Sequence, residues 1–240
     1  MIAGEIYSVG DGCPVPHKSI RGDHKMFRIS ASNMNLIECP RCFWNTLVLR
    51  APRPSMFSGL PGAIHRALDG YRSRLALEGG HPPWMPEGVL VQIPRRLRAL
   101  DPLTNVEVVG ELDALLKTPQ GYWIVDFKTA STPHDEVVRK RYYQHQMDTY
   151  HYLLEQHGYA PVLGALLIYF SPRMGEDHSR AVFPFNVTCI RLQTSAERVH
   201  TYLTKVREIL GGTRPPLSID CQYCNYIKQI GEIKEYFSSI

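Results

Sequence analysis

The sequence predicts an α/β fold in which helices flank a mixed β-sheet. Segments typical of helices and strands follow one another in the order helix, strand, strand, strand, helix, strand, and glycines and prolines separate them. The 240 residues are 44% hydrophobic and 21% charged, as in a globular chain long enough to bury a substantial core. A formal net charge of +4 is modest and by itself excludes no class of partner.

The N-terminal part is expected to contain an irregular arm and two helices. Residues 1–28 carry Gly, Pro and charge without clear periodicity. Ser30 to Asn33 form a favourable N-cap region for a helix from Leu36 to Leu49. A second helix is expected from Leu60 to about Leu77, between a proline-marked break and a pair of glycines.

The remaining chain is expected to supply the sheet and two further helices. Strands are predicted at residues 89–93, 106–116, 122–127, 163–170 and 181–192. A long helix is expected at 136–157 and another at 196–210, and the tail 215–240 begins with two prolines. We expect residues 29–240 to form a single domain.

The most informative motif is Gly110-Glu111-Leu112-Asp113 followed by Asp126-Phe127-Lys128. Folding the chain symmetrically about the turn Thr118–Gly121 places residue 113 opposite residue 126. Directly opposed residues of an antiparallel pair share a face, with Cβ atoms about 4.5–5.5 Å apart. Lys128, two residues further on, projects from the same face. The two carboxylates and the ammonium group are therefore predicted to converge.

Two carboxylates at that separation repel each other unless a cation lies between them. Carboxylate oxygens with retained water suit Mg²⁺ or Mn²⁺, and a nearby lysine can position an attacking water. The alternative is a surface hairpin with a cross-strand ion ladder, in which Glu111 faces Lys128. These residues alone leave both interpretations open.

Two pairs of residues at helical spacing indicate a functional role only when they are considered together with this motif. His65 and Asp69 lie four residues apart in the second predicted helix, and Gln146 and Tyr150 lie four apart in the long helix. Taken alone, a helix histidine is more often a surface residue, and a Gln–Tyr pair is more often the polar edge and a core aromatic of an amphipathic helix.

The order of these motifs resembles the PD-(D/E)XK nuclease superfamily, and in particular its RecB-like branch, which includes CRISPR-associated Cas-four-type exonucleases. The resemblance spans roughly residues 30–230 and implies a restriction-endonuclease-like αβββαβ core. It also implies an Mg²⁺ or Mn²⁺ site formed by the carboxylates of Asp113 and Asp126, the carbonyl of Phe127, and His65. Lys128 would position the nucleophilic water, while Gln146 and Tyr150 would help to hold the strand and the lysine.

Four of the six cysteines form a second motif, Cys39-x-x-Cys42 and Cys221-x-x-Cys224. Paired C-x-x-C units bind zinc or iron–sulfur centres. A disulfide within each pair and chance pairing are the alternatives, and stable disulfides are disfavoured inside cells. One shared metal would join residues 29–50 to residues 213–240 in a helical subregion clipped by the cysteines.

The metal at these cysteines is left open by spacing alone, since tetrahedral zinc suits them as well as a cluster does. The resemblance favours a 4Fe-4S cluster, although related iron–sulfur nucleases have one early and three late cysteines. Cys13 and Cys189 are expected to take no part.

The sequence therefore predicts a metal-dependent DNA nuclease in which water attacks the phosphodiester directly. Single-stranded DNA or DNA with frayed ends is the favoured substrate, because the chain combines basic clusters with neighbouring aromatic residues. The clusters are Arg95–Arg98, Arg139–Arg141 and Arg50 with Arg53, and the aromatic residues are Tyr142 and Tyr143. One rival is a catalytically silent nucleic-acid- or partner-binding module in a larger DNA-processing complex. Another is a zinc-clipped structural protein. No signal peptide or membrane span is recognised, so a cytoplasmic protein is expected.

Overall fold

The computed structural model describes residues 26–50, 85–173 and 184–238 of the chain. The predicted helix at 60–77, with His65, lies outside the described residues, as does most of the predicted arm 1–28.

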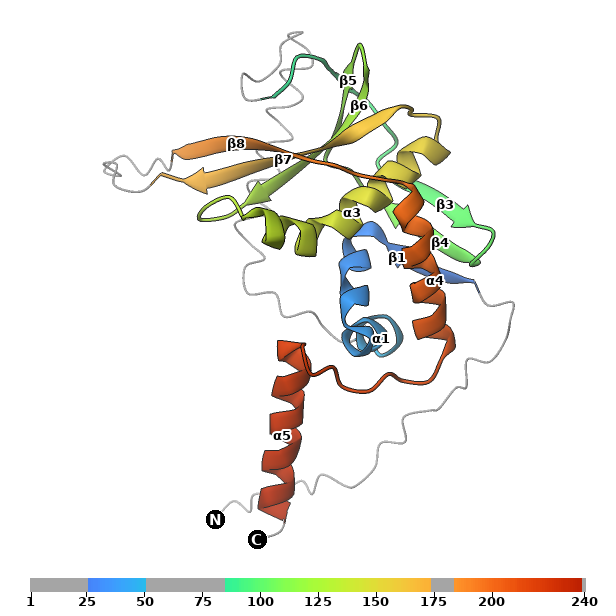
Figure 1. Cartoon of the computed structure of the whole chain (residues 1–240), viewed down its shortest axis with the longest axis vertical. Coiled ribbons are helices and arrows are strands. Elements are labelled where there is room, and N and C mark those ends of the chain that lie inside the picture. Colours follow the sequence, from blue (N-terminus) through green and yellow to red (C-terminus); the bar gives the residue numbers. More distant parts are fainter. Residues whose placement is uncertain (1–25, 51–84, 174–183, 239–240) are drawn as a thin grey trace, which may run out of the picture.

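The centre of the fold is a five-stranded mixed sheet with the order β2-β5-β6-β7-β8 (Figure 1). Its strands are β2 (Val89–Val91), β5 (Ala114–Thr118), β6 (Gly121–Thr129), β7 (Val162–Pro172) and β8 (Phe185–Leu192). The β6–β7 pair is parallel, and the other three pairs are antiparallel. The α/β class with a mixed sheet flanked by helices is thus confirmed.

Helix α3 (Glu136–Gln156) connects the two parallel strands and covers one face of the sheet (Figure 1). A parallel pair requires such a crossover. The helix begins where the Asp135 carboxylate accepts a hydrogen bond from the backbone N–H of Val138 at 2.8 Å. The interface with the sheet is a continuous apolar core that includes Met147, Leu153, Leu154, Leu115, Ile124, Ala165 and Leu167.

A smaller three-stranded sheet has the order β1-β4-β3 and consists of β1 (Phe27–Ser30), β3 (Leu97–Asp101) and β4 (Val106–Gly110). The single strand predicted at 106–116 is therefore wrong in one respect, because it divides at residues 111–113 into strands of two different sheets. Strands β1 and β3 were not predicted. Both form by pairing with β4, and β1 pairs in parallel with it from a segment remote in sequence.

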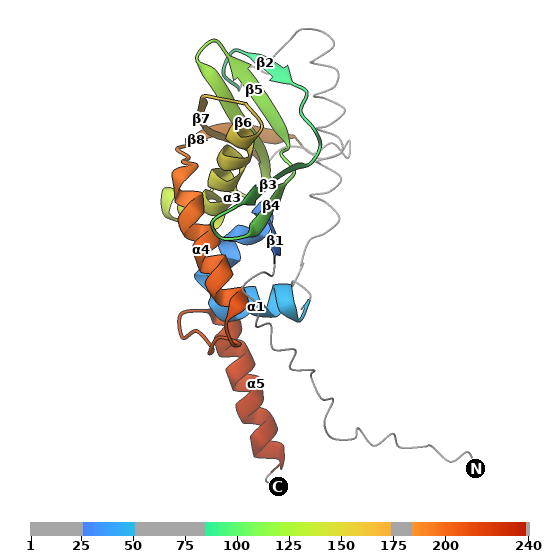
Figure 2. The ribbon, with the colours of Figure 1, turned by 90° about the vertical axis from the view of Figure 1, so that its right-hand side faces the viewer.

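Helical segments form the other end of the body. The predicted helix at 36–49 is a 3-10 helix, η1 (Ala31–Glu38), followed by α1 (Pro40–Val48), with the proline at the first helical position. Helices α4 (Glu197–Gly211) and α5 (Gln222–Ser238) follow the sheet. Helix α5 projects away from the sheets, with its N-terminal end near α1 (Figure 2).

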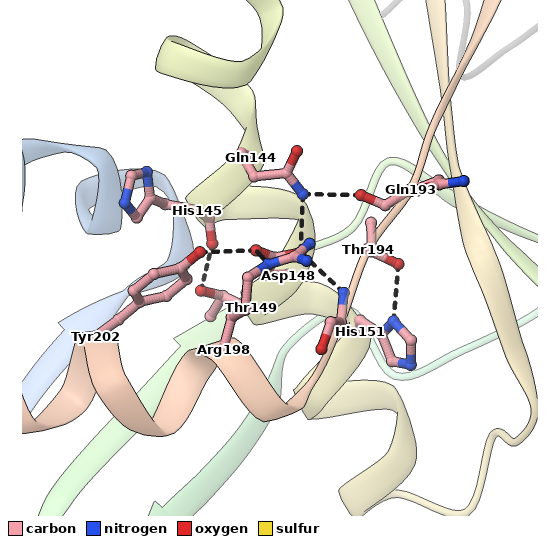
Figure 3. A network of polar contacts seen from close by, with 10 residues as sticks. Gln144, His145, Asp148, Thr149, His151, Gln193, Thr194, Arg198 and Tyr202 are labelled. Carbon is pink, nitrogen blue, oxygen red and sulfur yellow. Dashed lines mark hydrogen bonds and ion pairs between the residues drawn. The ribbon is translucent and has the colours of Figure 1, made fainter.

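Helix α3 is fastened to α4 by the carboxylate of Asp148, which is fully buried (Figure 3). Five hydrogen bonds of 2.7–2.9 Å reach its two oxygens, from the side chains of Gln144, Arg198 (two bonds) and Tyr202 and from the backbone N–H of Ser195. A buried charge with this many donors is compensated, so the network fixes the position of α3 over the sheet. Among the described helices, none combines the length and apolar character needed to cross a bilayer.

Candidate functional site

The register of the β5–β6 hairpin matches the register predicted from the turn. Thr118 pairs with Gly121 and Ala114 pairs with Val125, so the next opposed positions are Asp113 and Asp126. Strand alternation places Asp126 on the same face as Ile124, which is the face covered by α3. The two aspartates thus lie together just beyond the last paired residues of the hairpin, where the chain connects β4 of one sheet to β5 of the other.

The Asp113 carboxylate is held by the neighbouring strand. Its Oδ2 atom accepts a hydrogen bond from the backbone N–H of Phe127 at 2.8 Å. In an antiparallel pair the N–H and C=O of one residue point to the same neighbouring strand. The carbonyl of Phe127 is therefore also directed towards the side of β5, beyond the end of the ladder, where Asp113 lies.

Asp126 and Lys128 form an ion pair inside the site. Asp126 is 3% exposed, and the Lys128 side chain is 18% exposed. Burial alone lowers the pKa of Lys128, but the carboxylate of Asp126, with smaller contributions from Tyr143 and Asp113, outweighs burial and raises this pKa above its ordinary value. Lys128 is consequently an ammonium group at neutral pH.

The alternative ion ladder between Glu111 and Lys128 does not form. Glu111 instead pairs with Arg96 at 2.6 Å, with Arg95 more distant at 3.9 Å. Part of the first basic cluster is thus neutralised by an acidic neighbour within the chain, and the lysine is left to the two aspartates.

Gln146 and Tyr150 hold the connection between the two sheets. The Tyr150 hydroxyl donates to the carbonyl of Glu111 at 2.8 Å and accepts from Gln146 Nε2 at 3.0 Å. Burial, followed by the charge of Asp126, raises the pKa of Tyr150, so its hydroxyl stays protonated and can donate. The bond to the Glu111 carbonyl is the contact that support of the strand by this pair would require. The two hydrogen bonds found for Tyr150 are with the Glu111 carbonyl and with Gln146, and neither involves Lys128.

Gly110 allows this connection to approach α3. A Cβ atom at Gly110 would lie 2.7 Å from Leu153 Cδ1 and 2.9 Å from Tyr150 Cε1. Real Cβ atoms do not approach other atoms so closely, so the glycine of the Gly-x-x-Asp motif is a requirement of packing.

Two residues that the sequence did not assign to the site complete the surroundings of the lysine. The ammonium nitrogen of Lys128 lies 4.6 Å from the centre of the Tyr143 ring, and the Tyr143 hydroxyl is 3.0 Å from His134 Nδ1. Burial raises the pKa of Tyr143. Tyr143 precedes Gln146 by three residues and Tyr150 by seven, and this helical spacing is the signal that could have identified it. His134 lies in a loop and gives no such signal.

The four paired cysteines meet between α1 and α5. All their Sγ atoms lie within 4.8 Å of one another, and the sulfur of Cys39 is 3.6 Å from that of Cys224. The sulfur of Cys42 is 3.6 Å from Cys221 and 3.8 Å from Cys224. The predicted union of the N- and C-terminal pairs is confirmed. Cys189, by contrast, lies on β8.

The four thiols differ in acidity. Burial raises the pKa of Cys39 to about 11 and also raises that of Cys42. Burial also opposes ionisation of Cys221, but hydrogen bonds from the backbone N–H of Cys224 and from the neighbouring thiols outweigh it and lower the pKa of Cys221 to about 7. Cys221 immediately precedes α5, where helix N–H groups stabilise a thiolate.

The segment before α5 is also clamped to α1 by polar contacts. Arg41 donates to the carbonyl of Pro215 at 2.5 Å, and Arg214 donates to the side-chain oxygen of Asn45 at 3.1 Å. These bonds join the segment that leads into α5 to the helix that carries Cys42.

The site fits a hard divalent cation by its donor set. Two carboxylates and one carbonyl are directed to the same place, and within the described part of the chain Asp126 Oδ2 has no hydrogen bond besides its ion pair with Lys128. Oxygen donors of this kind suit Mg²⁺ or Mn²⁺. His65, the fourth predicted ligand, lies outside the described residues.

A family profile and a solved structure are similar to this chain. Among curated proteins no match is found. A solved structure titled "Crystal structure of SSO0001" is similar at 14% sequence identity, with a TM-score of 0.45 and 85% of each chain covered. The sequence matches the family profile described as PD-(D/E)XK nuclease superfamily over residues 28–229, which is most of the chain. The chain therefore belongs to the PD-(D/E)XK nuclease superfamily.

Proposed function

We propose that this protein is a metal-dependent deoxyribonuclease of the RecB-like, Cas-four-type branch. The observation that carries the proposal is the convergence of Asp113, Asp126 and Lys128 at one end of a hairpin, on the face covered by α3. Membership of a nuclease superfamily indicates the reaction class. The meeting of N-terminal with C-terminal cysteines at one place resembles this branch, although the two-plus-two spacing differs from its usual pattern.

The cation would be held by Asp113, Asp126 and the carbonyl of Phe127, with His65 as a further ligand. When bound, a divalent ion of this kind polarises the phosphate and lowers the pKa of a coordinated water. The N–H of Phe127 orients the Asp113 carboxylate before an ion binds, so little further ordering of this side chain is needed. No residue in this set is a suitable covalent nucleophile, so direct attack by water is expected.

Lys128 would act as a positive charge and hydrogen-bond donor. Its raised pKa keeps the proton on the ammonium group at neutral pH, which argues against a role as general base in this state. The ammonium can stabilise negative charge that develops on the phosphate and can position the water. The Tyr143 ring beneath it restricts where the side chain can point.

The substrate would be single-stranded DNA or DNA with frayed ends. Tyr142 is 48% exposed beside Arg141, at the start of α3, where a base could stack on its ring. Tyr143 is occupied by Lys128 and His134 and is not available for stacking in the same way. Binding should weaken as salt concentration rises.

The test is hydrolysis of end-labelled single- and double-stranded DNA with Mn²⁺ by the native protein and two variants. Asp126→Asn and Lys128→Met should each reduce the rate at least about 100-fold. Lys117→Met is the matched control, because Lys117 lies on the same hairpin and is exposed. Its rate should equal that of the native protein.

The rival function is a silent nucleic-acid- or partner-binding module of the same fold. The intact pair of aspartates with its lysine favours the enzyme. Equal residual cleavage by the native protein and both site variants would reject the nuclease, and retained salt-dependent DNA binding would then support the module.

A further inference from the structure

We propose that the four cysteines hold a single tetrahedral ion of the zinc type and not the 4Fe-4S cluster that the family resemblance implies. This inference refines the four-cysteine centre of the proposed function but does not depend on nuclease activity. It rests on the spacing of the sulfur atoms.

The distances between sulfurs fit one shared ion. A tetrahedral zinc ion has Zn–S bonds of about 2.3 Å, which places its sulfurs about 3.8 Å apart. The measured separations are 3.6 Å for Cys39–Cys224, 3.6 Å for Cys42–Cys221 and 3.8 Å for Cys42–Cys224. Every other pair of the four is within 4.8 Å. The thiols therefore need only small movements to enclose an ion.

A cubane cluster needs more room than these thiols leave. Each of its four irons carries its own thiolate on the outside of the cube, so the sulfurs of the four cysteines lie farther apart than around a single ion. No pair among Cys39, Cys42, Cys221 and Cys224 is separated by more than 4.8 Å. Inserting a cluster would require α5 to move away from α1, although the Arg41–Pro215 and Arg214–Asn45 contacts hold the segment before α5 against α1.

Two disulfides also account for the positions of the four sulfurs less well than one shared ion does. Cys42 is almost equally close to Cys221 and to Cys224, so the four sulfurs surround a common centre and do not divide into two pairs. All four thiols are free in the structure, at separations well beyond the bond length of about 2 Å.

The local backbone favours a negatively charged thiolate centre. Cys39 precedes α1 and Cys42 lies in its first turn, while Cys221 precedes α5 and Cys224 lies in its first turn. The centre is thus bordered by two helix N-termini, whose dipoles stabilise negative charge. A zinc ion with four thiolates carries a net charge of about −2, which such surroundings compensate.

The consequence for the fold is that the ion would fasten α5 to the body. Helix α5 projects away from the sheets and meets α1 near the cysteines (Figures 1 and 2). Loss of the ion should release α5 and leave the distant β5–β6 hairpin in place.

The test begins with the metal content of the full chain, purified under anaerobic conditions from cells supplied with both iron and zinc. Elemental analysis should find about one zinc per chain and no stoichiometric iron or acid-labile sulfide. X-ray absorption at the zinc edge should show four sulfur neighbours at about 2.3 Å and no metal–metal distance. About four irons and four sulfides per chain, with a brown colour, would overturn the proposal. Metal-free protein with two disulfides by mass spectrometry would also overturn it.

Variants locate the ion. Cys42→Ser should lose the zinc, whereas Cys189→Ser, a free cysteine on β8, should keep it. If Cys42→Ser does not fold, titration of native protein with a thiol-modifying mercurial should release one zinc as four thiols react. Zinc retained after all four have reacted would contradict the assignment. Lys128→Met should retain the full zinc content even when inactive, so failure of the nuclease hypothesis and failure of this one remain distinguishable.

Discussion

Replacing Asp148 by Asn should destabilise the whole domain, because the amide cannot satisfy the donors that surround it. The carboxylate accepts five hydrogen bonds, of which those from Arg198 Nε and Tyr202 end on Oδ2. In the Asp148→Asn variant an NH₂ group replaces one of the two oxygens, so at least two of these bonds are lost and donor faces donor. Each bond to a charged group is worth about 1.5–3 kcal/mol.

The loss of unfolding free energy depends on how well the donors that lose their acceptor can be hydrated by water. The Arg198 side chain is 46% exposed and can be rehydrated, while Asp148 is completely buried. We therefore take the lower limit for two bonds, about 3 kcal/mol of lost unfolding free energy. With a urea m-value of about 2–3 kcal/mol per M, the unfolding midpoint should fall by roughly 1 M.

The assay is urea denaturation followed by circular dichroism, with Glu136→Gln as the matched control. Glu136 is an exposed acid on the same helix that pairs with Lys140. Its substitution should shift the midpoint far less, because exposed ion pairs contribute little. Equal midpoints for Asp148→Asn and the control would refute the view that this network holds α3 in place.

Three further predictions concern the site and its support. Gly110→Ala should lower the free energy of unfolding by about 1–3 kcal/mol and reduce the rate of DNA cleavage, because the new Cβ collides with Leu153 and Tyr150. The control Gly211→Ala, with open space around it, should change neither the unfolding free energy nor the cleavage rate. Tyr150→Phe should lower the free energy of unfolding by about 1–3 kcal/mol, because it removes the donor to the Glu111 carbonyl. The control Tyr226→Phe, at an exposed tyrosine, should leave the unfolding free energy unchanged. Equal stabilities of the two variants would contradict the role of that hydrogen bond. Burial lowers the pKa of His145 below 6.5 despite the opposing effect of Glu38, so its contribution to stability is present above pH 6.5 and is lost as the pH falls. The difference in unfolding free energy between native protein and His145→Gln, measured by denaturation from about pH 8 to about pH 5, should shrink towards low pH. A constant difference would contradict this direction of the pH dependence.

The hairpin at the centre of the site could be read from the sequence because its determinants are local. The turn at Thr118–Gly121 fixes the register, so the opposition of Asp113 and Asp126 followed from counting residues away from it. Helix α3 was likewise predictable, since it extends over many turns between clear boundaries. The meeting of the cysteine pairs was expected from the two C-x-x-C motifs, because paired C-x-x-C units commonly bind one shared metal, and the structure brings the four sulfurs together.

Other features could not be predicted because they depend on partners distant in the chain. The division of residues 106–116 between two sheets depends on the remote strands with which β4 and β5 pair, and β1 forms by pairing with β4. The position of Tyr143 beneath Lys128 likewise depends on how α3 lies over the sheet.

The sequence by itself thus determined the chemistry that is available: two aspartates and a lysine in hairpin register, and four thiols in two pairs. Tertiary structure alone decided how these groups are held, through Tyr150 on the Glu111 carbonyl and through the distances between sulfurs. The physical reason is that register and local motifs arise from short-range backbone geometry, whereas separations between elements arise from packing that involves the whole chain.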